Sequence, residues 1–382
     1  METNRRQFKV YENGKFVTKE LSFNSGALSP FSSNELFILP GFVDVHVHLR
    51  EPGFSYKETI ETGTLAAAAG GFTAVCSMPN LNPAPDSIEN LKVQTNIISE
   101  KAKIHVYPYG CITKGSKGEA LSDMDELAEH VIAFTDDGRG VQSDDMMRQA
   151  MLKAKSLSKM IVAHCEVESC APSPESEYLQ VERDLKLVSE IGCKYHLCHA
   201  STKESIDLIR QAKKAGLPVS VETAPHYLIF SDKDVKDSGD FKMNPPIRSQ
   251  ADKEALIEGI CDGTIDMIAT DHAPHSAEEK SRGFKNSLNG IVGIETSFPL
   301  MYTNFVKTKI ISFEKLIQLM SDNPRNIFNI PLYENDGIIV DLSTQFTVDK
   351  NEFKSMGRAM PYDGMTLYGK CLGTFINGRM IK

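Results

Sequence analysis

The stretch that decides the fold is Phe42-Val-Asp-Val-His46-Val-His48-Leu-Arg50, with Pro40-Gly41 before it and Glu51-Pro52-Gly53 after it. Its apolar run predicts a buried β-strand that opens into a loop near the arginine. Residues two apart in a strand point to the same side, so His46, His48 and Arg50 share one face. Two imidazoles on one face form half of a metal site, and a guanidinium beyond them can hold an anionic group close to the metal.

Seven further apolar runs follow this strand, and helix-like segments separate most of them. The eight predicted strands cover residues 42–48, 72–78, 104–109, 131–135, 160–164, 194–199, 217–222 and 265–270. They are rich in Val, Ile and Ala with little alternation, as expected for parallel strands that are buried on both faces. Eight β/α units predict a (β/α)8 TIM barrel of the α/β class, and an open doubly wound sheet is the alternative.

The two ends of the chain have a different pattern. Asn13-Gly14 and Asn377-Gly378 each lie between extended runs, and Asn-Gly in that setting predicts a β-hairpin. We therefore expect residues 39–330 to form the barrel domain. Residues 1–38 and 331–382 are expected to meet in one small β-domain beside it.

Composition excludes several classes of protein. The 382 residues have a formal net charge of -9 and no block of Lys and Arg, which argues against nucleic-acid binding. No apolar run is as long as the roughly 18 residues that a membrane-spanning helix needs. The eight cysteines include no CxxC pair and are expected to be reduced thiols. A cytoplasmic location is the expectation.

Polar residues follow most of the predicted strands at the point where each strand ends. They are His46, His48, Asn80, Asp136, Asp137, His164, His199, Asp271 and His275. Taken singly, Asp136-Asp137-Gly138 is typical of a turn and His199 of a core histidine. In a barrel, however, the carboxyl ends of all strands open onto one face, so these residues would converge. Imidazole and carboxylate ligands without cysteine suit zinc, and their number favours two ions that share a carboxylate.

These motifs resemble the amidohydrolase superfamily and, within it, the dihydroorotases. The resemblance covers residues 39–328. It rests on the stretch from Gly41 to Gly53, Met78-Pro-Asn80, Lys242-Met-Asn244-Pro-Pro-Ile-Arg248 and Ala269-Thr-Asp-His-Ala-Pro-His275. It implies a barrel with a composite β-domain built from both termini.

The resemblance also implies a ligand set for two Zn²⁺ ions per chain. His46, His48 and Asp271 would hold one ion, and His164 and His199 would hold the other. Most relatives in the superfamily bridge the metals with a carboxylated lysine, whereas this chain has Asp136-Asp137 at that place. We expect Asp137 to be the bridge, with Asp136 as the alternative.

The implied activity is the reversible cyclisation of N-carbamoyl-L-aspartate to L-dihydroorotate in pyrimidine biosynthesis. Asp271 would move the proton, Arg50, Asn80 and His275 would bind the substrate carboxylate, and Asn244 would contact the ring amide.

The alternatives are another cyclic amidohydrolase, acting on hydantoin, dihydropyrimidine or allantoin, or a protein without turnover. The latter would be a dihydroorotase-like subunit or a structural metal module. The implied partners are the small-molecule substrate, a second copy in a homodimer and, with no support in the sequence, aspartate transcarbamoylase. The connection from His164 to His199 is shorter than the resemblance implies, around residues 169–177.

Overall fold

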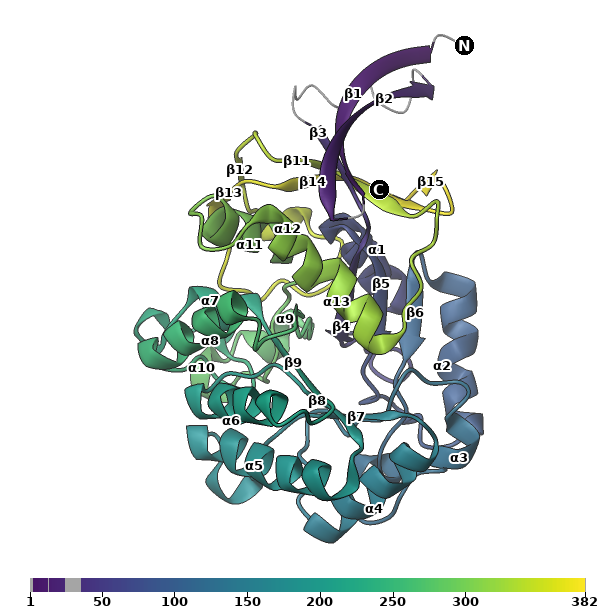
Figure 1. Ribbon diagram of the computed structural model, residues 1–382, viewed down its shortest axis with the longest axis vertical. Helices are drawn as coiled ribbons and strands as arrows, with labels where there is room; N and C mark the ends of the chain where they lie inside the picture. The colour runs from purple at the N-terminus through teal and green to yellow at the C-terminus, as the bar shows by residue number, and fades with distance from the viewer. Residues whose placement is uncertain (1–2, 13, 25–35, 382) are drawn as a thin grey trace.

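Parallel strands form the centre of the computed structural model, which describes residues 3–12, 14–24 and 36–381 (Figure 1). The strands of this central sheet are β4 (Phe42–Val47), β5 (Phe72–Ser77), β6 (His105–Pro108), β7 (Met160–Ala163), β8 (Lys194–Leu197), β9 (Val219–Thr223) and β10 (Met267–Ile268). Every residue of β4, β5 and β7 is buried, as expected for strands that are covered on both faces.

The parallel pairings close the sheet into a barrel. Strands β4, β5 and β6 pair in that order, and β7, β8, β9 and β10 pair in that order. Phe134 joins the two groups through bridges to Gly110 and Ile161, and a bridge between Val47 and His272 closes the ring. The predicted barrel is therefore confirmed, and the open doubly wound sheet is wrong. The expected fourth strand over residues 131–135 is reduced to the bridges at Phe134.

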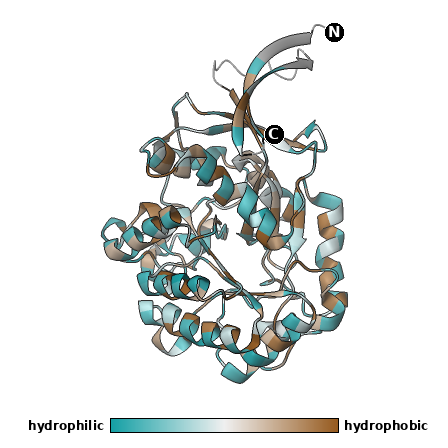
Figure 2. Cartoon of the chain, viewed as in Figure 1, coloured by the Kyte–Doolittle hydropathy of each residue, from teal (hydrophilic) through white to brown (hydrophobic). Residues whose placement is uncertain are grey.

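Helices surround the barrel, and in Figure 2 they carry both hydrophilic and hydrophobic residues, as amphipathic helices do. The longer ones are α1 (Ile60–Gly70), α2 (Ile88–Lys101), α4 (Asp144–Ser156), α5 (Pro174–Ile191), α6 (Lys203–Lys214) and α8 (Gln250–Asp262). The shorter ones are α3 (Met124–Leu127), α7 (Pro225–Ile229), α9 (Ala277–Lys280), α10 (Gly283–Asn286), α11 (Ser297–Met301), α12 (Phe313–Ile317) and α13 (Asn323–Phe328). Single turns are η1 (Lys114–Ser116), η2 (Glu168–Cys170), η3 (Asp232–Asp234), η4 (Gly239–Phe241), η5 (Tyr302–Val306), η6 (Gln318–Asp322) and η7 (Lys350–Glu352).

Side-chain caps set the ends of the first barrel helix. The sequence predicts a helix over residues 57–69, but α1 begins at Ile60 because the Thr59 side chain accepts a hydrogen bond from the Thr62 amide. Gly71 ends the helix at φ 92°, a left-handed conformation that glycine adopts without a steric penalty. The later start leaves Lys57 and Glu58 in the preceding loop, where both side chains make contacts to distant segments.

A second sheet combines strands from both ends of the chain and lies beside the barrel, with both termini close to it (Figure 1). In spatial order its strands are β15 (Arg379–Met380), β14 (Lys370–Ile376), β11 (Gly337–Asp341), β3 (Leu36–Leu39), β1 (Thr3–Glu12) and β2 (Lys15–Asn24).

Both expected hairpins occur in this second sheet. Strands β1 and β2 pair up to Glu12 and Lys15, and Asn13 lies outside the described residues. Strands β14 and β15 pair up to Ile376 and Arg379. Asn377 at φ 50° and Gly378 at φ 74° form the turn, and two positive φ values suit a two-residue hairpin.

Part of the C-terminal segment leaves this sheet and packs on the barrel. Strands β12 (Phe346–Thr347) and β13 (Thr366–Leu367) form a separate pair, and Tyr362 between them is buried beside Val292 and Leu300. Ser355 and the Met356 amide donate hydrogen bonds to the buried Glu58 carboxylate. Domain boundaries at residues 39 and 330 remain our proposal.

The expectations about membrane-spanning helices and about reduced cysteines can be compared with the residues that the structure describes. Within it, none of the helices combines the length and the apolar character that crossing a membrane requires. All eight cysteines lie in this part, and each is a free thiol.

Candidate metal centre

Six side chains from five strand ends converge at one mouth of the barrel. His46 is the last residue but one of β4, and His48 follows the strand. Asp137 follows the Phe134 bridge, His164 follows β7, His199 follows β8 and Asp271 follows β10. All six are buried, with at most 6% of each residue exposed. These are the six residues that the sequence predicts as metal ligands, and the barrel closure brings them together.

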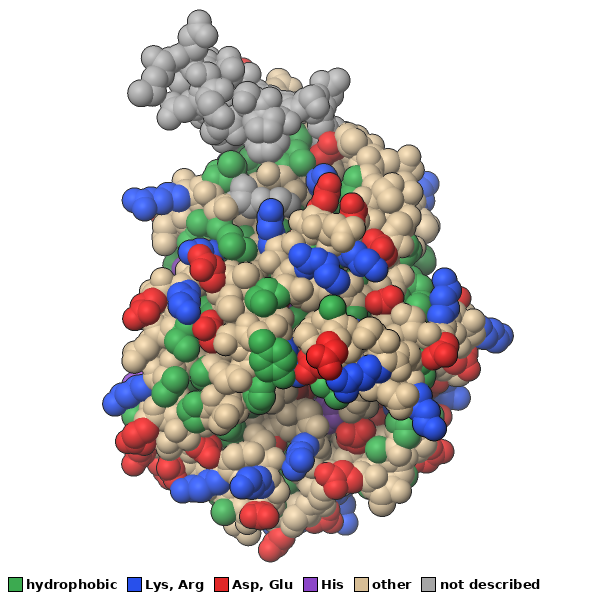
Figure 3. All heavy atoms as spheres, turned by 180° about the vertical axis from the view of Figure 1, so that it is seen from behind, with side chains coloured by type: hydrophobic (Ala, Val, Ile, Leu, Met, Phe, Trp, Pro, Cys, Tyr) green, Lys and Arg blue, Asp and Glu red, His purple; other side chains and the backbone are tan. Residues whose placement is uncertain are grey.

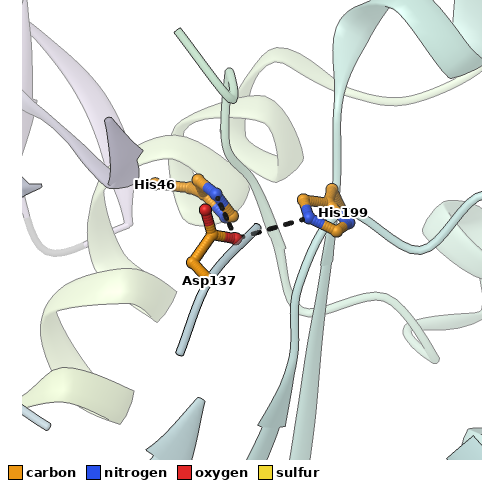
Figure 4. Close-up of side chains that lie close together, drawn as sticks. All are labelled: His46, Asp137 and His199. Atoms are coloured by element: carbon orange, nitrogen blue, oxygen red, sulfur yellow. Dashed lines mark ion pairs between the residues drawn. The ribbon is translucent and has the colours of Figure 1, made fainter. Parts of the chain in front are cut away.

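Asp137 lies at the centre of this group (Figure 4). Its Oδ1 is 3.2 Å from His46 Nε2 and 3.7 Å from both His164 Nδ1 and His199 Nε2. Its Oδ2 is 3.4 Å from His48 Nε2. One carboxylate therefore faces four imidazoles, which is the position that a bridging ligand needs.

Asp136 points away from the centre. Its carboxylate accepts hydrogen bonds from the Ile112 amide at 2.8 Å and from the amide and hydroxyl of Thr113. These donors already satisfy the buried carboxylate. The geometry favours Asp137 over Asp136 as the bridge, although both residues stand in the same turn.

Two observations test whether a metal fits these residues. His46 Nε2 and Asp137 Oδ1 are fully buried, and neither has a hydrogen-bond partner among the described residues. A buried polar atom without a partner is costly, and a shared cation would satisfy both atoms. The separations of 3.1–3.7 Å among these nitrogen and oxygen atoms are also suitable, because two ligands about 2.0–2.1 Å from one tetrahedral ion lie about 3.3 Å apart. The donor set fits a divalent ion such as zinc.

Outer partners orient the ligating rings. Glu222 at the end of β9 accepts from His46 Nδ1 at 2.7 Å, and Asn80 Oδ1 accepts from His48 Nδ1 at 2.8 Å. Each contact leaves the Nε2 lone pair directed toward the centre. Burial by itself would raise the pKa of Glu222, but His46 and His196 lower it to about 2. Glu222 has no role in the sequence prediction, although a charged residue at the end of a buried strand was the available signal.

Asp271 lies against both histidines of the first strand. Its Oδ1 is 3.1 Å from His48 Nε2 and 3.6 Å from His46 Nε2. Burial favours the protonated acid, yet the hydrogen bond to His48 and the charge of His46 hold its pKa below the usual range. Asp271 is therefore ionised at neutral pH.

Backbone strain is concentrated at this end of the barrel. Arg50, His199 and Asp271 have φ values of 60°, 32° and 47°, in the left-handed region that residues other than glycine rarely adopt. Such conformations persist where the surrounding structure enforces them, and they are common at functional sites.

Arg50, Lys57 and His275 form a second group at the rim. Arg50 Nε donates to the Pro274 carbonyl at 3.1 Å, and Arg50 Nη2 is 3.3 Å from His275 Nε2. Lys57 Nζ is 3.2 Å from His275 Nδ1 and 3.0 Å from Glu279 Oε1. This group links the loop after β4 to the loop after β10. Lys57 has no role in the sequence prediction, which places it at the start of a helix.

The partners of His275 define its protonation state. Nε2 is 2.7 Å from the Asn289 carbonyl, which only accepts, while Nδ1 faces the Lys57 ammonium, which only donates. Glu279 Oε2 also lies 3.4 Å from Nδ1, so it is the shorter contact to Asn289 that favours a proton on Nε2. Burial, Arg50 and Lys57 lower the pKa of His275 to about 3, in agreement with that state. His275 thus joins the loop after β10 to Asn289, and its role as a donor to substrate stays a prediction.

Asn244 and Glu166 lie on the side of the site near His164. Both oxygens of Glu166 are 3.2 Å from Asn244 Nδ2, and Glu166 Oε2 is 3.5 Å from His164 Nε2. The hydrogen bond from His164 is the largest influence that lowers the pKa of Glu166. The face opposite to that of Figure 1 has a hollow in its lower half, with a histidine side chain visible in it (Figure 3).

Known proteins resemble this chain both in sequence and in fold. The family model described as Dihydro-orotase-like matches residues 36–182. Proteins named dihydroorotase from Fusobacterium nucleatum and Geobacillus thermodenitrificans are 45% and 43% identical to this chain. In both cases the match covers 97% of this chain and 96% of the relative.

Solved structures with lower identity share the architecture. An L-hydantoinase (dihydropyrimidinase) from Arthrobacter aurescens superposes with a TM-score of 0.86 at 24% identity, over 98% of this chain and 95% of that one. A D-hydantoinase superposes with a TM-score of 0.85 at 19% identity, over 100% of this chain and 95% of that one. At these identities the likeness shows the barrel with its β-domain, and the reaction has to be argued from the site.

Proposed function

The chain belongs to the dihydroorotase family, and from this premise we propose how its site performs that family's reaction. The protein is a metal-dependent cyclic amide hydrolase that interconverts L-dihydroorotate and N-carbamoyl-L-aspartate. The observation that carries the proposal is Asp137 facing four imidazoles, with a cationic group at the rim of the same site.

We assign the metal ligands as two groups around one shared residue. His46, His48 and Asp271 would hold one Zn²⁺, His164 and His199 would hold the other, and Asp137 would be the residue shared between them. When bound, the ions act as Lewis acids and lower the pKa of water from about 16 to about 7. Glu222 and Asn80 keep His46 and His48 in the tautomer that this ligation requires.

Asp271 moves the proton of the reaction. In the direction of hydrolysis, the oxygen of water forms a bond to the ring carbonyl carbon, and the bond from that carbon to the ring nitrogen breaks. Asp271 accepts the proton of the water and delivers it to the departing nitrogen. Its place beside His46 and His48, at the centre of the site, suits it for both transfers.

Arg50 binds the substrate carboxylate. Its guanidinium is held at the rim by the Pro274 carbonyl and can give two parallel hydrogen bonds to a carboxylate. Asn80 and His275 are the other two proposed contacts to the substrate carboxylate. Asn244 faces the ring amide.

Replacing Arg50 by lysine should lower kcat/KM for L-dihydroorotate by about ten- to a thousandfold, or about 1.4–4 kcal/mol. An ammonium is a point charge and cannot reproduce the planar fork. Arg148→Lys is the control, because Arg148 lies on the outer helix α4 and pairs with Glu190 at the surface. Wild-type kinetics in Arg50→Lys would show that Arg50 does not bind the carboxylate.

Turnover of L-dihydroorotate by purified protein, with zinc measured on the same sample, tests the proposed function. We expect about two zinc ions per chain, and we expect chelation to abolish activity and added Zn²⁺ to restore it. Hydantoin and dihydrouracil, which lack the carboxylate, should be poor substrates. Two bound ions with turnover of hydantoin alone would favour the hydantoinase alternative. A protein that binds no metal and turns over none of these would be a non-catalytic relative.

We also propose a cytoplasmic location, which is the expectation from composition, and a homodimer, which is the expectation from the family. Light scattering of the purified chain alone would test the homodimer. The same measurement with aspartate transcarbamoylase added would test whether the two proteins associate, which has no support in the sequence.

A further inference from the structure

The carboxylate of Glu166 has contacts on two sides of the site. On one side Oε2 is 3.5 Å from His164 Nε2, and on the other both oxygens are 3.2 Å from Asn244 Nδ2. His164 is a proposed metal ligand, and Asn244 is a proposed substrate contact. Among the described residues, Glu166 is the one that contacts both side chains, so it joins the proposed metal ligand to the proposed substrate contact.

The contact to His164 selects its tautomer. His164 Nδ1 faces the centre, 2.9 Å from His199 Nε2 and 3.7 Å from Asp137 Oδ1. A nitrogen that binds a metal carries no proton, so Nε2 must carry it. The carboxylate of Glu166 can only accept, which makes it the partner that this N–H needs.

The contact to Asn244 selects the orientation of its amide. Because a carboxylate only accepts, the NH2 group of Asn244 must face Glu166. The Oδ1 atom is then the part of the amide that remains for the substrate. Asn244 therefore offers an acceptor, and the complementary group on the substrate is an N–H of the ring.

Backbone contacts hold Glu166 in this place. The Glu166 amide donates to Gln180 Oε1 at 3.0 Å, and its carbonyl accepts from Gln142 Nε2 at 2.7 Å. Gln180 lies on α5, which begins at Pro174 within the short connection noted in the sequence. The connection is short, yet its helix still supports the residue that follows His164.

We propose that Glu166 is a positioning residue that couples one metal ion to recognition of the substrate N–H. It orients His164 toward the ion and Asn244 toward the ring amide with the same carboxylate. This inference rests on the proposed function for the identity of the substrate. The contact with His164 stands independently of that identity.

The test compares Glu166→Gln, Asn244→Ala, the double variant and the control Glu168→Gln. Glu168 is exposed and lies two residues from Glu166. Two quantities are measured for each protein: the affinity of the metal-free protein for Zn²⁺, by competition with a chelator, and kcat and KM for L-dihydroorotate. If Glu166→Gln does not fold, Glu166→Asp takes its place, since it keeps the charge but shortens the reach to both partners.

We expect Glu166→Gln to weaken binding of one of the two ions by about ten- to a hundredfold and to raise KM by about tenfold. Asn244→Ala should raise KM and leave zinc affinity unchanged. In the double variant, KM should be no higher than in Asn244→Ala, because Glu166 acts on the substrate through Asn244. Glu168→Gln should match the wild type.

Wild-type zinc affinity in Glu166→Gln would overturn the inference. So would KM increases that multiply in the double variant, because they would show independent action. If the wild type does not turn over L-dihydroorotate, the proposed function fails. The zinc affinity of Glu166→Gln then still decides whether Glu166 orients His164.

Discussion

Replacing Asp271 by asparagine should lower kcat by about 10³- to 10⁴-fold, in the upper part of the range for loss of a general acid–base group. The amide keeps an oxygen that can bind an ion, but it can neither accept the proton of water nor deliver it to the ring nitrogen. The measurement is kcat for L-dihydroorotate with zinc determined on the same sample. The loss should therefore occur with metal still bound.

The control for this variant is Asp262→Asn. Asp262 lies at the end of α8, partly exposed, and pairs with Arg210. It should keep wild-type kinetics. If Asp271→Asn retained wild-type kcat with both ions bound, another group would carry the proton.

Replacing Asp137 by asparagine should remove at least one ion and lower activity by at least about a thousandfold. The Asp137 carboxylate faces all four imidazoles, and an amide has a single oxygen to share. Its NH2 group would also point at nitrogen atoms that need a cation. The measurement is zinc content after gel filtration, together with kcat for L-dihydroorotate.

The neighbouring residue provides the matched control. Asp136→Asn should keep both ions, because Asp136 accepts from Ile112 and Thr113 and points away from the histidines. It should lower the free energy of unfolding by about 1–3 kcal/mol, since part of a buried hydrogen-bond set is lost. If Asp136→Asn lost zinc and Asp137→Asn kept it, the bridge would be Asp136.

The positions of the predicted strand ends explain why many residues of the site could be predicted from the sequence. Parallel buried strands read as apolar runs, and the carboxyl ends of all barrel strands meet at one face. His46, His164, His199 and Asp271 could therefore be grouped before any distance was known. The fourth predicted strand is the least regular, because Phe134 alone makes bridges there. Its predicted position in the barrel was still correct, since Phe134 bridges Gly110 on one side and Ile161 on the other.

The direction in which a side chain points could not be predicted from the sequence in the same way. Asp136 and Asp137 are chemically identical neighbours, and only the donors at Ile112 and Thr113 separate their roles. The contacts of His275 are likewise set by Lys57 and Asn289, which no pattern in the sequence indicates. In each case the deciding partner lies at least 14 residues away along the chain.

The sequence by itself determined the alternation of buried strands with helices, the hairpins at both ends and the polar residues at the strand ends, because these depend on local periodicity, turn residues and the order of elements along the chain. The closure of the strands into a barrel rather than an open sheet needed the tertiary structure. Only the tertiary structure decided that Asp137 faces the histidines, that Glu222 and Glu166 orient them, and that residues 355–356 dock on Glu58. The physical reason is that a hydrogen bond depends on distance and angle between two side chains, and contacts between residues far apart in the chain exist only once the barrel has closed.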